Sequence, residues 1–494
     1  MAQRLCPSRP TVLDVDGVPV AILQYTSEAN DVVSFVRALP LAMRTPALTV
    51  LLELLAMSRG AKHWPTPRLY SATYDEIDCI GAAISLFNSA CINGFCLSKH
   101  WPASGDPAFR LPFCGFVAMW AAKMTSVDMS DLKYPTYRDE FCRMLARCTS
   151  LKRACIPTEV DLLEAVTSSA HSVAELSLAP PDNSENFPPR AVAALQRWLA
   201  SGHVRRLKLA KFSGPTDAGL ARALATSPTL ASLCLSECNV VLDSIIAHGG
   251  VLTSITELDL TTNTGNLVPR LLPLLPLSKL RSLSLQCLDR MDLGNCLIPA
   301  LPHLSALENL ALDMVKLGDA DVQLSSVPSA LRTLKLDYVD VSASSLIALL
   351  DWASRSTHLE SVAAMRSGCF GANHDSAVDT LTRCVQAGAR RVQFVNCDID
   401  TRGASALAKA LRKTHASVPL ELDLTKNPFR LGATQALLKA LATCTNVSIQ
   451  LPSACHSFVD GDQSYVAKAK AGGVTIELRG WEVFICSRTE ATRA

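Results

Sequence analysis

The sequence predicts an α/β solenoid, in which repeated strands form a curved parallel sheet and the segments between them form helices on its outer side. Three observations indicate this fold class. A motif with the spacing apolar-x-x-apolar-x-apolar recurs along most of the 494 residues. Several segments between the motifs place leucines four residues apart, as on one face of a helix. Hydrophobic residues make up 49% of the chain and aromatic residues only 5%, so aliphatic side chains must build the core.

The motif is clearest in the middle of the chain. Five copies follow one another at intervals of 25, 25, 27 and 24 residues, starting at Leu230, Ile255, Leu280, Leu307 and Leu331. Further copies start upstream at Val204 and Val173 and, more weakly, downstream at Leu359, Ala389, Pro419, Cys444 and Gly473. Three faint copies end in Phe95 and Leu97, Val127 and Met129, and Ala154 and Ile156. One copy cannot bury its apolar positions alone, so three or more must stack.

The segments after the strands also carry a pattern. A side chain that bonds backbone groups of the neighbouring turn is expected eight positions after the start of a copy, at Cys238, Asn263, Cys397 and Asn427. Amphipathic helices are expected over residues 216–224, 401–411 and 432–441. Three prolines between Asn263 and Leu277 predict extended or single-turn structure there instead of a regular helix.

With expected strands on the inner side, helices on the outer side and this repeat length, the chain resembles the ribonuclease-inhibitor-like superfamily of leucine-rich-repeat proteins. The resemblance covers residues 90–480, with degenerate first copies, and leaves residues 481–494 as a C-terminal cap and tail. It implies a leucine-rich-repeat solenoid with a curved parallel sheet inside and helices outside. Such repeat proteins commonly bind other proteins through the concave side of the sheet.

Residues 1–75 contain no repeat strand and predict a small helical module, with helices over Val18–Tyr25, Asp31–Leu39 and Ala47–Met57. Ile22-Leu23, Asp31-Val32-Val33, Phe35, Val36 and Leu39 resemble an F-box. That resemblance implies docking of residues 18–39 on the adaptor subunit of a cullin-based ubiquitin ligase. The Leu-Pro that opens an F-box is absent, Pro19 falls in the first helix, and no tryptophan precedes Trp64. The alternative is a helical cap that covers the first repeat.

Composition bounds the function classes. The chain carries 47 basic and 45 acidic side chains, a net charge of +2, which does not favour nucleic acid. Eighteen cysteines without a Cys-x-x-Cys pair, and an opening segment that does not resemble a signal peptide, predict a reduced protein of the cytoplasm or nucleus. The uncharged stretch Cys79–Ser98 contains asparagines and glycines, so we expect no membrane segment.

No phosphate-binding loop, nucleophile elbow or zinc-protease motif occurs, and we expect no catalytic residue, cofactor or metal. A cysteine-dependent hydrolase using Cys369, near His374 and Asp375, is the enzyme alternative to a plain connecting loop. The tetrapeptide Lys-His-Trp-Pro occurs at 62–65 and 99–102; its tryptophans are expected to pack over loops. Cysteines 234, 238, 384, 397 and 444 are expected to be buried.

The residues that flank the inward apolar positions should face the concave side, because side chains alternate along a strand. The sequence therefore predicts a protein-binding surface on that side. Its members are Arg206, Lys208, Glu257, Asp259, Asn309, Asp313, Lys335, Asp337, Arg391, Gln393, Glu421 and Asp423. Mixed charge of this kind suits a protein partner, of unknown identity, better than a uniform phosphate chain. The alternative is a solvated charged face without a partner.

Overall fold

The computed structural model describes residues 18–67, 73–93, 120–129, 138–179, 188–212, 218–318, 324, 327–328, 330–366, 374–412, 419–456, 459, 463–480 and 482–488. The chain divides into two compact units, Met1–Ala223 and Leu224–Ala494. Helix α10 (Ala218–Thr226) contains the residues at which the units divide.

The first unit begins with a helical module. Its helices are α1 (Val18–Tyr25), α2 (Ala29–Ala38), α3 (Pro46–Ala56) and α4 (Tyr74–Ala82), so the three helices expected there are confirmed. Helix α3 starts where the Thr45 hydroxyl accepts the Leu48 N–H at 3.3 Å. The Trp64 indole N–H donates to the Thr26 carbonyl at 2.7 Å, and its ring lies 5.7 Å from that of Phe87. This tryptophan therefore closes the module by packing over a loop, as expected.

Parallel strands follow in the same unit. They pair in chain order as β1 (Ala90–Asn93), β2 (Met124–Asp128), β3 (Arg153–Pro157), β4 (Glu175–Ala179) and β5 (Arg206–Ala210). Helices α7 (Arg138–Leu145), α8 (Val160–Val166) and α9 (Pro189–Leu199) connect them. Two of the faint copies are confirmed, because Val127, Met129, Ala154 and Ile156 are all buried. Phe95 and Leu97 lie outside the described residues.

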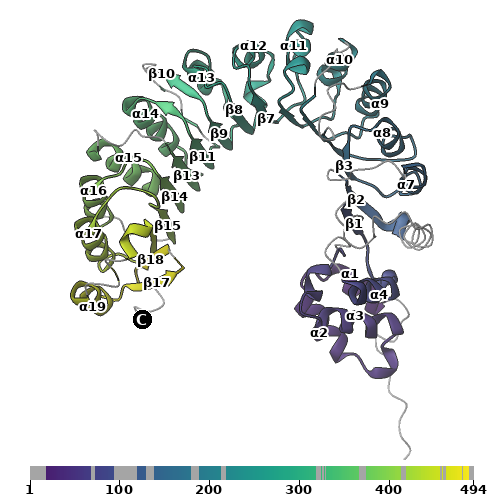
Figure 1. The fold of residues 1–494 in the computed structure, drawn as a ribbon, viewed down its shortest axis with the longest axis horizontal. Coiled ribbons are helices and arrows are strands. Elements are labelled where there is room, and N and C mark those ends of the chain that lie inside the picture. Colours follow the sequence, from purple (N-terminus) through teal and green to yellow (C-terminus); the bar gives the residue numbers. More distant parts are fainter. Residues whose placement is uncertain are drawn as a thin grey trace, which may run out of the picture. The chain divides into compact units, whose positions relative to one another are not determined.

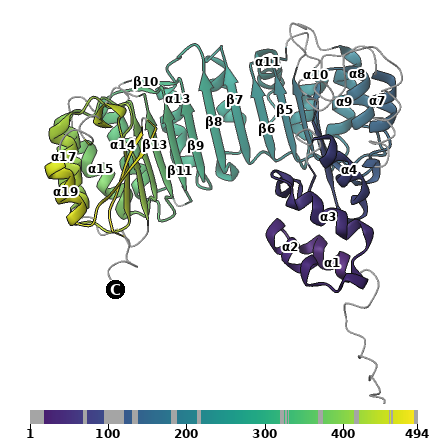
Figure 2. The ribbon, with the colours of Figure 1, turned by 60° about the horizontal axis from the view of Figure 1, so that its bottom comes forward.

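The second unit repeats the same plan over a longer stretch (Figures 1 and 2). Its parallel strands are β6 (Ser232–Ser236), β7 (Glu257–Thr262), β8 (Ser282–Cys287), β9 (Asn309–Asp313), β11 (Thr333–Asp337), β13 (Ser361–Met365), β14 (Arg391–Val395), β15 (Leu420–Asp423) and β16 (Val447–Leu451). Its helices are α11 (Asn239–His248), α12 (Leu267–Leu271), α13 (Gly294–Ala300), α14 (Ala343–Ser354), α15 (His374–Gln386), α16 (Thr401–Leu411), α17 (Leu431–Leu441) and α19 (Gln463–Ala471). The predicted leucine-rich-repeat solenoid is thereby confirmed as the fold.

Stacked leucines form the core of this unit. The parallel registers place Leu258, Leu283 and Leu310 side by side on consecutive strands, each no more than 2% exposed. Burying one such side chain stabilises the fold by about 2 kcal/mol. Because each leucine packs mainly against the equivalent residue of the next copy, the core exists only when copies stack.

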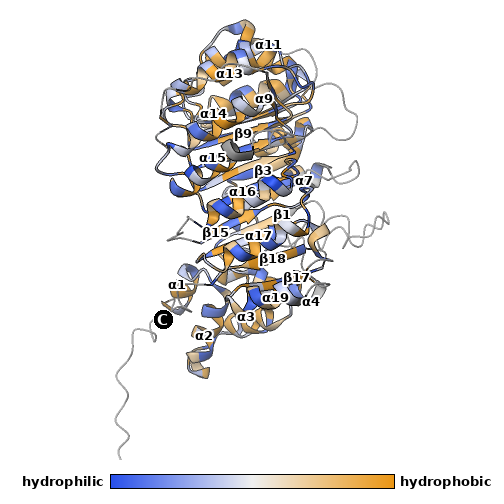
Figure 3. Cartoon of the chain, turned by 90° about the vertical axis from the view of Figure 1, so that its left-hand side faces the viewer, coloured by the Kyte–Doolittle hydropathy of each residue, from blue (hydrophilic) through white to orange (hydrophobic). Residues whose placement is uncertain are grey.

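The connections differ in length, as the sequence predicts. Helix α12 has five residues and is followed by the 3₁₀ turns Leu272–Leu274 and Leu277–Lys279. A separate two-stranded ribbon pairs β10 (Lys316–Gly318) with β12 (Asp340–Val341). Helices α16 and α17 cover the expected 401–411 and 432–441. Figure 3 shows that hydrophobic and hydrophilic residues both occur along the outer helices, such as α14 and α16.

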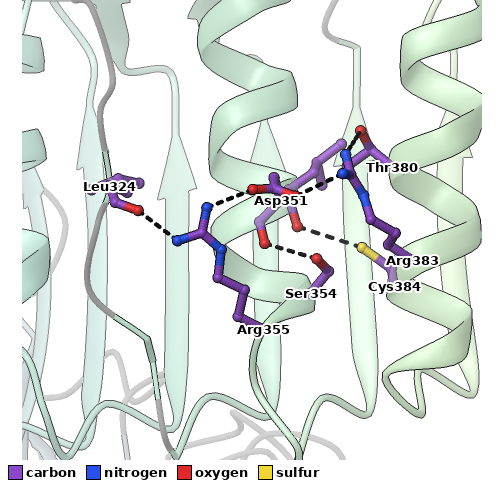
Figure 4. A network of polar contacts seen from close by, with 8 residues as sticks. Leu324, Asp351, Ser354, Arg355, Thr380, Arg383 and Cys384 are labelled. Carbon is purple, nitrogen blue, oxygen red and sulfur yellow. Dashed lines mark hydrogen bonds and ion pairs between the residues drawn. The ribbon is translucent and has the colours of Figure 1, made fainter.

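Neighbouring outer helices are joined by ion pairs. Asp351 on α14 binds Arg355 of its own helix at 2.7 Å and Arg383 of α15 at 3.1 Å (Figure 4). Beneath them, the Cys384 thiol donates to the Leu350 carbonyl at 3.6 Å. The carboxylate thus links two successive copies on their solvent side.

A left-handed residue directly follows several of the parallel strands. Its φ lies between 49° and 55° at Lys211, Glu237, Met314, Tyr338, Arg366 and Asn396. This conformation is unfavourable for side chains other than glycine. Here it aims the N–H at the next copy: Met314 donates to the Asp337 carbonyl at 2.9 Å, and Tyr338 to the Met365 carbonyl at 3.0 Å. The ladder between copies therefore continues one residue beyond the strands.

The inward residue expected after the strand is found in some copies only. Asn427 is buried, and its side chain accepts the N–H groups of Cys397 and Ile399 at 2.9 and 3.1 Å. Cys238 and Cys397 are buried as expected. Asn263 is exposed, which corrects the expectation for that copy. Strand β7 runs one residue further than most, so its last residue, Thr262, points inward in place of Asn263.

The copy that starts at Gly473 does not extend the parallel order. Its strand, β17 (Thr475–Arg479), pairs antiparallel with β18 (Glu482–Cys486), and β18 pairs antiparallel with β16. Only two residues separate β17 from β18. A parallel connection needs a crossover of a dozen residues or more, so such a short link allows only a hairpin.

Candidate functional site: the concave face of the second unit

Three rows of side chains line the face of the second unit's sheet that lies opposite its helices, called here the concave face (Figure 1). Strand registers align the first row as Ser232, Glu257, Ser282, Asn309, Thr333, Ser361, Arg391, Glu421 and Ser448. The second row is Cys234, Asp259, Ser284, Ala311, Lys335, Ala363, Gln393, Asp423 and Gln450. The third row is Ser236, Thr261, Gln286, Asp313, Asp337, Met365 and Val395.

All twelve residues expected on a concave side lie on strands with this alternation. Arg206 and Lys208 are exposed on β5 and belong to the first unit. The other ten lie in the three rows of the second unit. Asp259, Asn309, Lys335, Arg391 and Glu421 are exposed, while Glu257, Asp313, Gln393 and Asp423 are half-buried and Asp337 is buried.

Some of these residues are brought together by the registers. Arg391 lies opposite Glu421, and its Nε is 3.1 Å from the carboxylate. The two carboxylates Asp313 and Asp337 occupy equivalent positions on adjacent strands, although 24 residues separate them in the sequence. This acidic pair is a third acidic site on the face, in addition to Glu257 with Asp259 on β7 and Glu421 with Asp423 on β15.

A relay of hydrogen bonds crosses the third row. The Thr261 hydroxyl donates to Gln286 Oε1 at 3.1 Å, and Gln286 Nε2 donates to Asp313 Oδ2 at 2.9 Å. Asp313 Oδ1 is buried without a hydrogen-bond partner within the described residues. Burial, followed by the negative charge of Asp337, raises the pKa of Asp313. The negative charge of the Asp313 carboxylate on the concave face is therefore poorly stabilised by its surroundings.

Asp337 has the opposite environment. Arg366 donates to both of its carboxylate oxygens, from Nε at 2.9 Å and from Nη2 at 2.7 Å. The same guanidinium lies 3.7 Å from the centre of the Tyr338 ring. Such a bidentate ion pair fixes the orientation of both side chains. Asp337 is thus engaged within the fold, whereas Asp259 and Lys335 remain open to solvent.

Arg366, Gln286 and Tyr338 are not among the residues that the sequence indicates. Gln286 directly follows the last motif leucine of its copy, at the position that Asp313 and Asp337 occupy in theirs, so that position could have indicated it. Arg366 and Tyr338 follow their strands in the left-handed conformation, which the motif does not encode. Only the backbone path directs them back to the sheet.

The cysteines differ in environment. Cys384 and Cys444 are buried as expected, but Cys234 is half-buried on the concave face, with its thiol 3.5 Å from Asp259 Oδ2. Burial raises the pKa of Cys148 to about 11 and that of Cys287 and Cys384 to about 12. These thiols are therefore held in the protonated form, which is a poor nucleophile. Cys369, the residue of the hydrolase alternative, lies outside the described residues.

Metal binding and membrane insertion have no candidate among the described ranges. No group of three or more His, Cys, Asp and Glu side chains there is arranged to hold a metal ion. His63 is buried 3.7 Å from Glu76, while His100 lies outside those ranges. No helix within them is both long and apolar enough to cross a bilayer.

No protein-family model matches the chain, and no curated protein matches it. Among solved structures, a leucine-rich-repeat protein of Leptospira interrogans aligns with 74% of this chain and 91% of its own, at 12% identity and a TM-score of 0.29.

Proposed function

We propose that this protein is a non-enzymatic recognition protein that binds a protein partner through the concave face of its second unit. The observation that carries the proposal is the surface of three rows, mostly of polar and charged residues, which crosses successive strands and is opposite the helices (Figure 2). Extended sheet faces of this kind are the surfaces that repeat proteins use for binding.

The chemistry of the rows supports a protein partner. Serines and amides alternate with acids and bases, and exposed charges of both signs, such as Asp259 and Lys335, lie in the same row. A surface of mixed charge can match a specific arrangement of side chains but repels part of any uniformly charged polymer. We therefore propose no role in binding nucleic acid or membranes.

The test reverses exposed charges of the concave face. A triple variant Asp259→Lys, Lys335→Glu and Glu421→Lys keeps the Asp337–Arg366 pair intact. Affinity purification with quantitative mass spectrometry should show the main bound protein reduced at least tenfold, a loss of about 1.4 kcal/mol of binding free energy.

A matched control, with the same change in net charge, places three charge reversals on exposed residues of the outer helices, Asp243→Lys, Asp379→Lys and Lys409→Glu. This variant should retain the partner at the level of the unaltered protein. Equal recovery of the partner by the concave-face variant, or equal loss in the control, would contradict the assignment of this face. Circular dichroism of each variant verifies that the fold is intact.

A second candidate is docking of residues 18–39 on the adaptor of a cullin-based ubiquitin ligase. Two observations favour it. Helix α1 is apolar along most of its length, yet only Leu23 is buried, while Ile22 is 39% and Tyr25 94% exposed. Pro19 lies in the first turn of α1, where a proline is tolerated. Unpartnered apolar side chains on a helix are typical of a protein contact.

Co-purification of the full chain with the adaptor tests this second candidate. The double variant Ile22→Glu and Tyr25→Glu should abolish co-elution on gel filtration, because it places charges in an apolar contact. Val251→Glu, at a side chain 46% exposed in the second unit, is the control and should not affect co-elution. If the unaltered chain does not co-elute with the adaptor, this candidate is wrong, and the proposal for the concave face is unaffected.

A further inference from the structure

Strand β17, the outermost strand in the sheet of the second unit, has one edge without a partner strand in the described part of the chain. The strand order ends β16–β18–β17, so in the described part of the chain no strand pairs with the outer edge of β17. Four of its five residues are exposed, and Ile476 is half-buried. A strand edge presents backbone N–H and C=O groups that can pair with another strand.

The two faces of β17 differ in chemistry. Ile476 and Leu478 stand opposite Ile485 and Val483, which are fully buried, so they belong to the apolar side of the sheet. Leu478 is nevertheless 41% exposed. A leucine on the core side of the sheet is thus left without cover at the end of the array.

The other face of β17 carries charge. Glu477 and Arg479 point to the concave side, where Arg479 binds Glu477 at 2.7 Å and lies 4.8 Å from the centre of the Phe484 ring. Edge strands deter association when they carry charges of one sign. Here opposite charges stand two residues apart, with Leu478 between them on the other face.

We infer that β17 pairs antiparallel with β17 of a second copy of this chain, about a two-fold axis at Leu478. In this register Leu478 lies opposite Leu478 of the partner subunit. Glu477 lies opposite Arg479 of the partner subunit, and the same pair repeats on the other side of the axis. Ile476 meets Gly480 of the partner subunit, which has no side chain to clash. The two sheets then continue into one another, with both leucines on the apolar side.

The register follows from the charges. In an antiparallel pair, residues that face one another must point to the same side of the sheet. The two-fold axis must therefore pass at a residue that faces the same residue of the other chain, and not between two residues. An axis at Glu477 would set this carboxylate against Glu477 of the partner subunit, which is unfavourable. An axis at Leu478 instead forms two opposite-charge pairs and one apolar contact. Such a self-complementary strand fits a symmetric dimer of this chain.

The contact is small, because it involves one short strand from each chain. Interfaces below about 1,200 Å² in total area are typical of weak association. We therefore expect a reversible dimer with a dissociation constant of about 10 µM. The contact lies at the end of the array and is independent of the function proposed for the concave face.

Charge exchange in the full chain tests the pairing. Sedimentation velocity at about 100 µM, well above the expected dissociation constant, should show the unaltered chain mostly dimeric. Arg479→Glu or Glu477→Arg alone sets like charges against each other and should weaken the dimer at least tenfold. The double variant Glu477→Arg and Arg479→Glu restores both pairs in exchanged form and should restore the dimer.

A control reverses Arg332, which belongs to a similarly exposed ion pair with Glu360 at 2.7 Å. Arg332→Glu should leave the mass of the particle unchanged. The inference is overturned if the unaltered chain sediments as a monomer at this concentration. It is overturned equally if either single variant dimerises as well as the unaltered chain, or if the double variant stays monomeric. Unchanged circular dichroism spectra distinguish loss of pairing from loss of fold.

Discussion

Asn427 and Asn263 occupy the same position of the repeat but have different environments. Asn427 is buried, and its Nδ2 donates to the carbonyls of Phe394 and Leu424 at 2.5 and 2.9 Å. Its Oδ1 accepts two N–H groups from the preceding copy. Asn263 is exposed and bonds to side chains, those of Asn239 and Thr264. One asparagine therefore satisfies buried backbone, whereas the other contributes surface contacts.

The difference gives a matched pair of substitutions. Asn427→Ala removes the hydrogen bonds that this side chain makes to four buried backbone groups and should lower the free energy of unfolding by about 3 kcal/mol. Asn263→Ala should change it by less than about 0.5 kcal/mol, as expected at an exposed site. Urea denaturation followed by circular dichroism measures both values. Similar losses in the free energy of unfolding for the two variants would show that the shared position in the repeat, and not the burial of the asparagine, determines the loss.

Asp313 gives a prediction about pH. Because its pKa in the folded protein is raised above the ordinary value of 3.8, the folded state binds its proton more tightly than the unfolded state does. Its contribution to stability is therefore present at low pH and is lost as the pH rises from about 3.8 through the raised pKa. Asp313→Asn removes the charge but keeps an oxygen for Gln286 and should raise the melting temperature at pH 7.

The gain from Asp313→Asn should shrink as the pH falls below the ordinary aspartate range. Asp423→Asn is the comparison, at a half-buried acid of the same face whose carboxylate accepts the Thr425 N–H and hydroxyl at 3.0 and 2.8 Å. It should bring no such gain. Calorimetric scans between acidic and neutral pH measure the two differences. A gain for Asp313→Asn that is independent of pH would contradict the electrostatic explanation.

At the scale of the elements, a glycine at the start of a helix can let the helix backbone approach a neighbouring strand closely. Helix α13 begins at Gly294, where an added Cβ would lie 2.1 Å from the Leu317 carbonyl oxygen of β10. Gly432 stands near the start of α17, where an added Cβ would have its nearest neighbour 4.0 Å away, at Thr401. The first glycine allows a helix and a ribbon to touch, while the second has room for a side chain.

Alanine at the two glycines should therefore have opposite effects. Gly294→Ala must push α13 away from β10 and should destabilise the protein by about 2 kcal/mol. Gly432→Ala should stabilise it by about 0.5 to 1 kcal/mol, because alanine loses less backbone freedom in a helix. Thermal unfolding compares the two variants. A loss of stability at Gly432, or none at Gly294, would contradict the geometry.

At the scale of the whole molecule, stability in a solenoid is local, because each copy contacts only its neighbours. The two compact units need not unfold together. Cys148 in the first unit and Cys384 in the second are both buried, with pKa values raised to about 11 and about 12. Each thiol should therefore react with a maleimide only after its own copies open.

Labelling along a urea gradient, read by mass spectrometry of peptides, makes this measurable. We expect Cys148 and Cys384 to become reactive with different midpoints, since they report on different units. Both should resist labelling in the native protein, and a fully denatured sample gives the upper limit. A single common midpoint would show that the whole chain unfolds in one cooperative step.

The sequence by itself determined the repeat and its strands. The spacing of leucines such as Leu258 and Leu260 places apolar residues on one side of a strand, and a strand that buries one side must stack on its neighbours. The same alternation alone assigns Asp259 and Lys335 to the opposite face. Helices α1, α16 and α17 followed from local signals as well, because capping and four-residue spacing act within one helix.

Only the tertiary structure decided how the copies meet. The pairing of Arg366 with Asp337, the proximity of Asp313 to Asp337 and the exposure of Asn263 depend on register and on where each strand ends. The open edge of β17 arises because β18 inserts beside β16, a choice between parallel and antiparallel partners that the motif at Gly473 does not encode. Local patterns fix what each segment becomes, while contacts between distant segments fix which side chains share a surface.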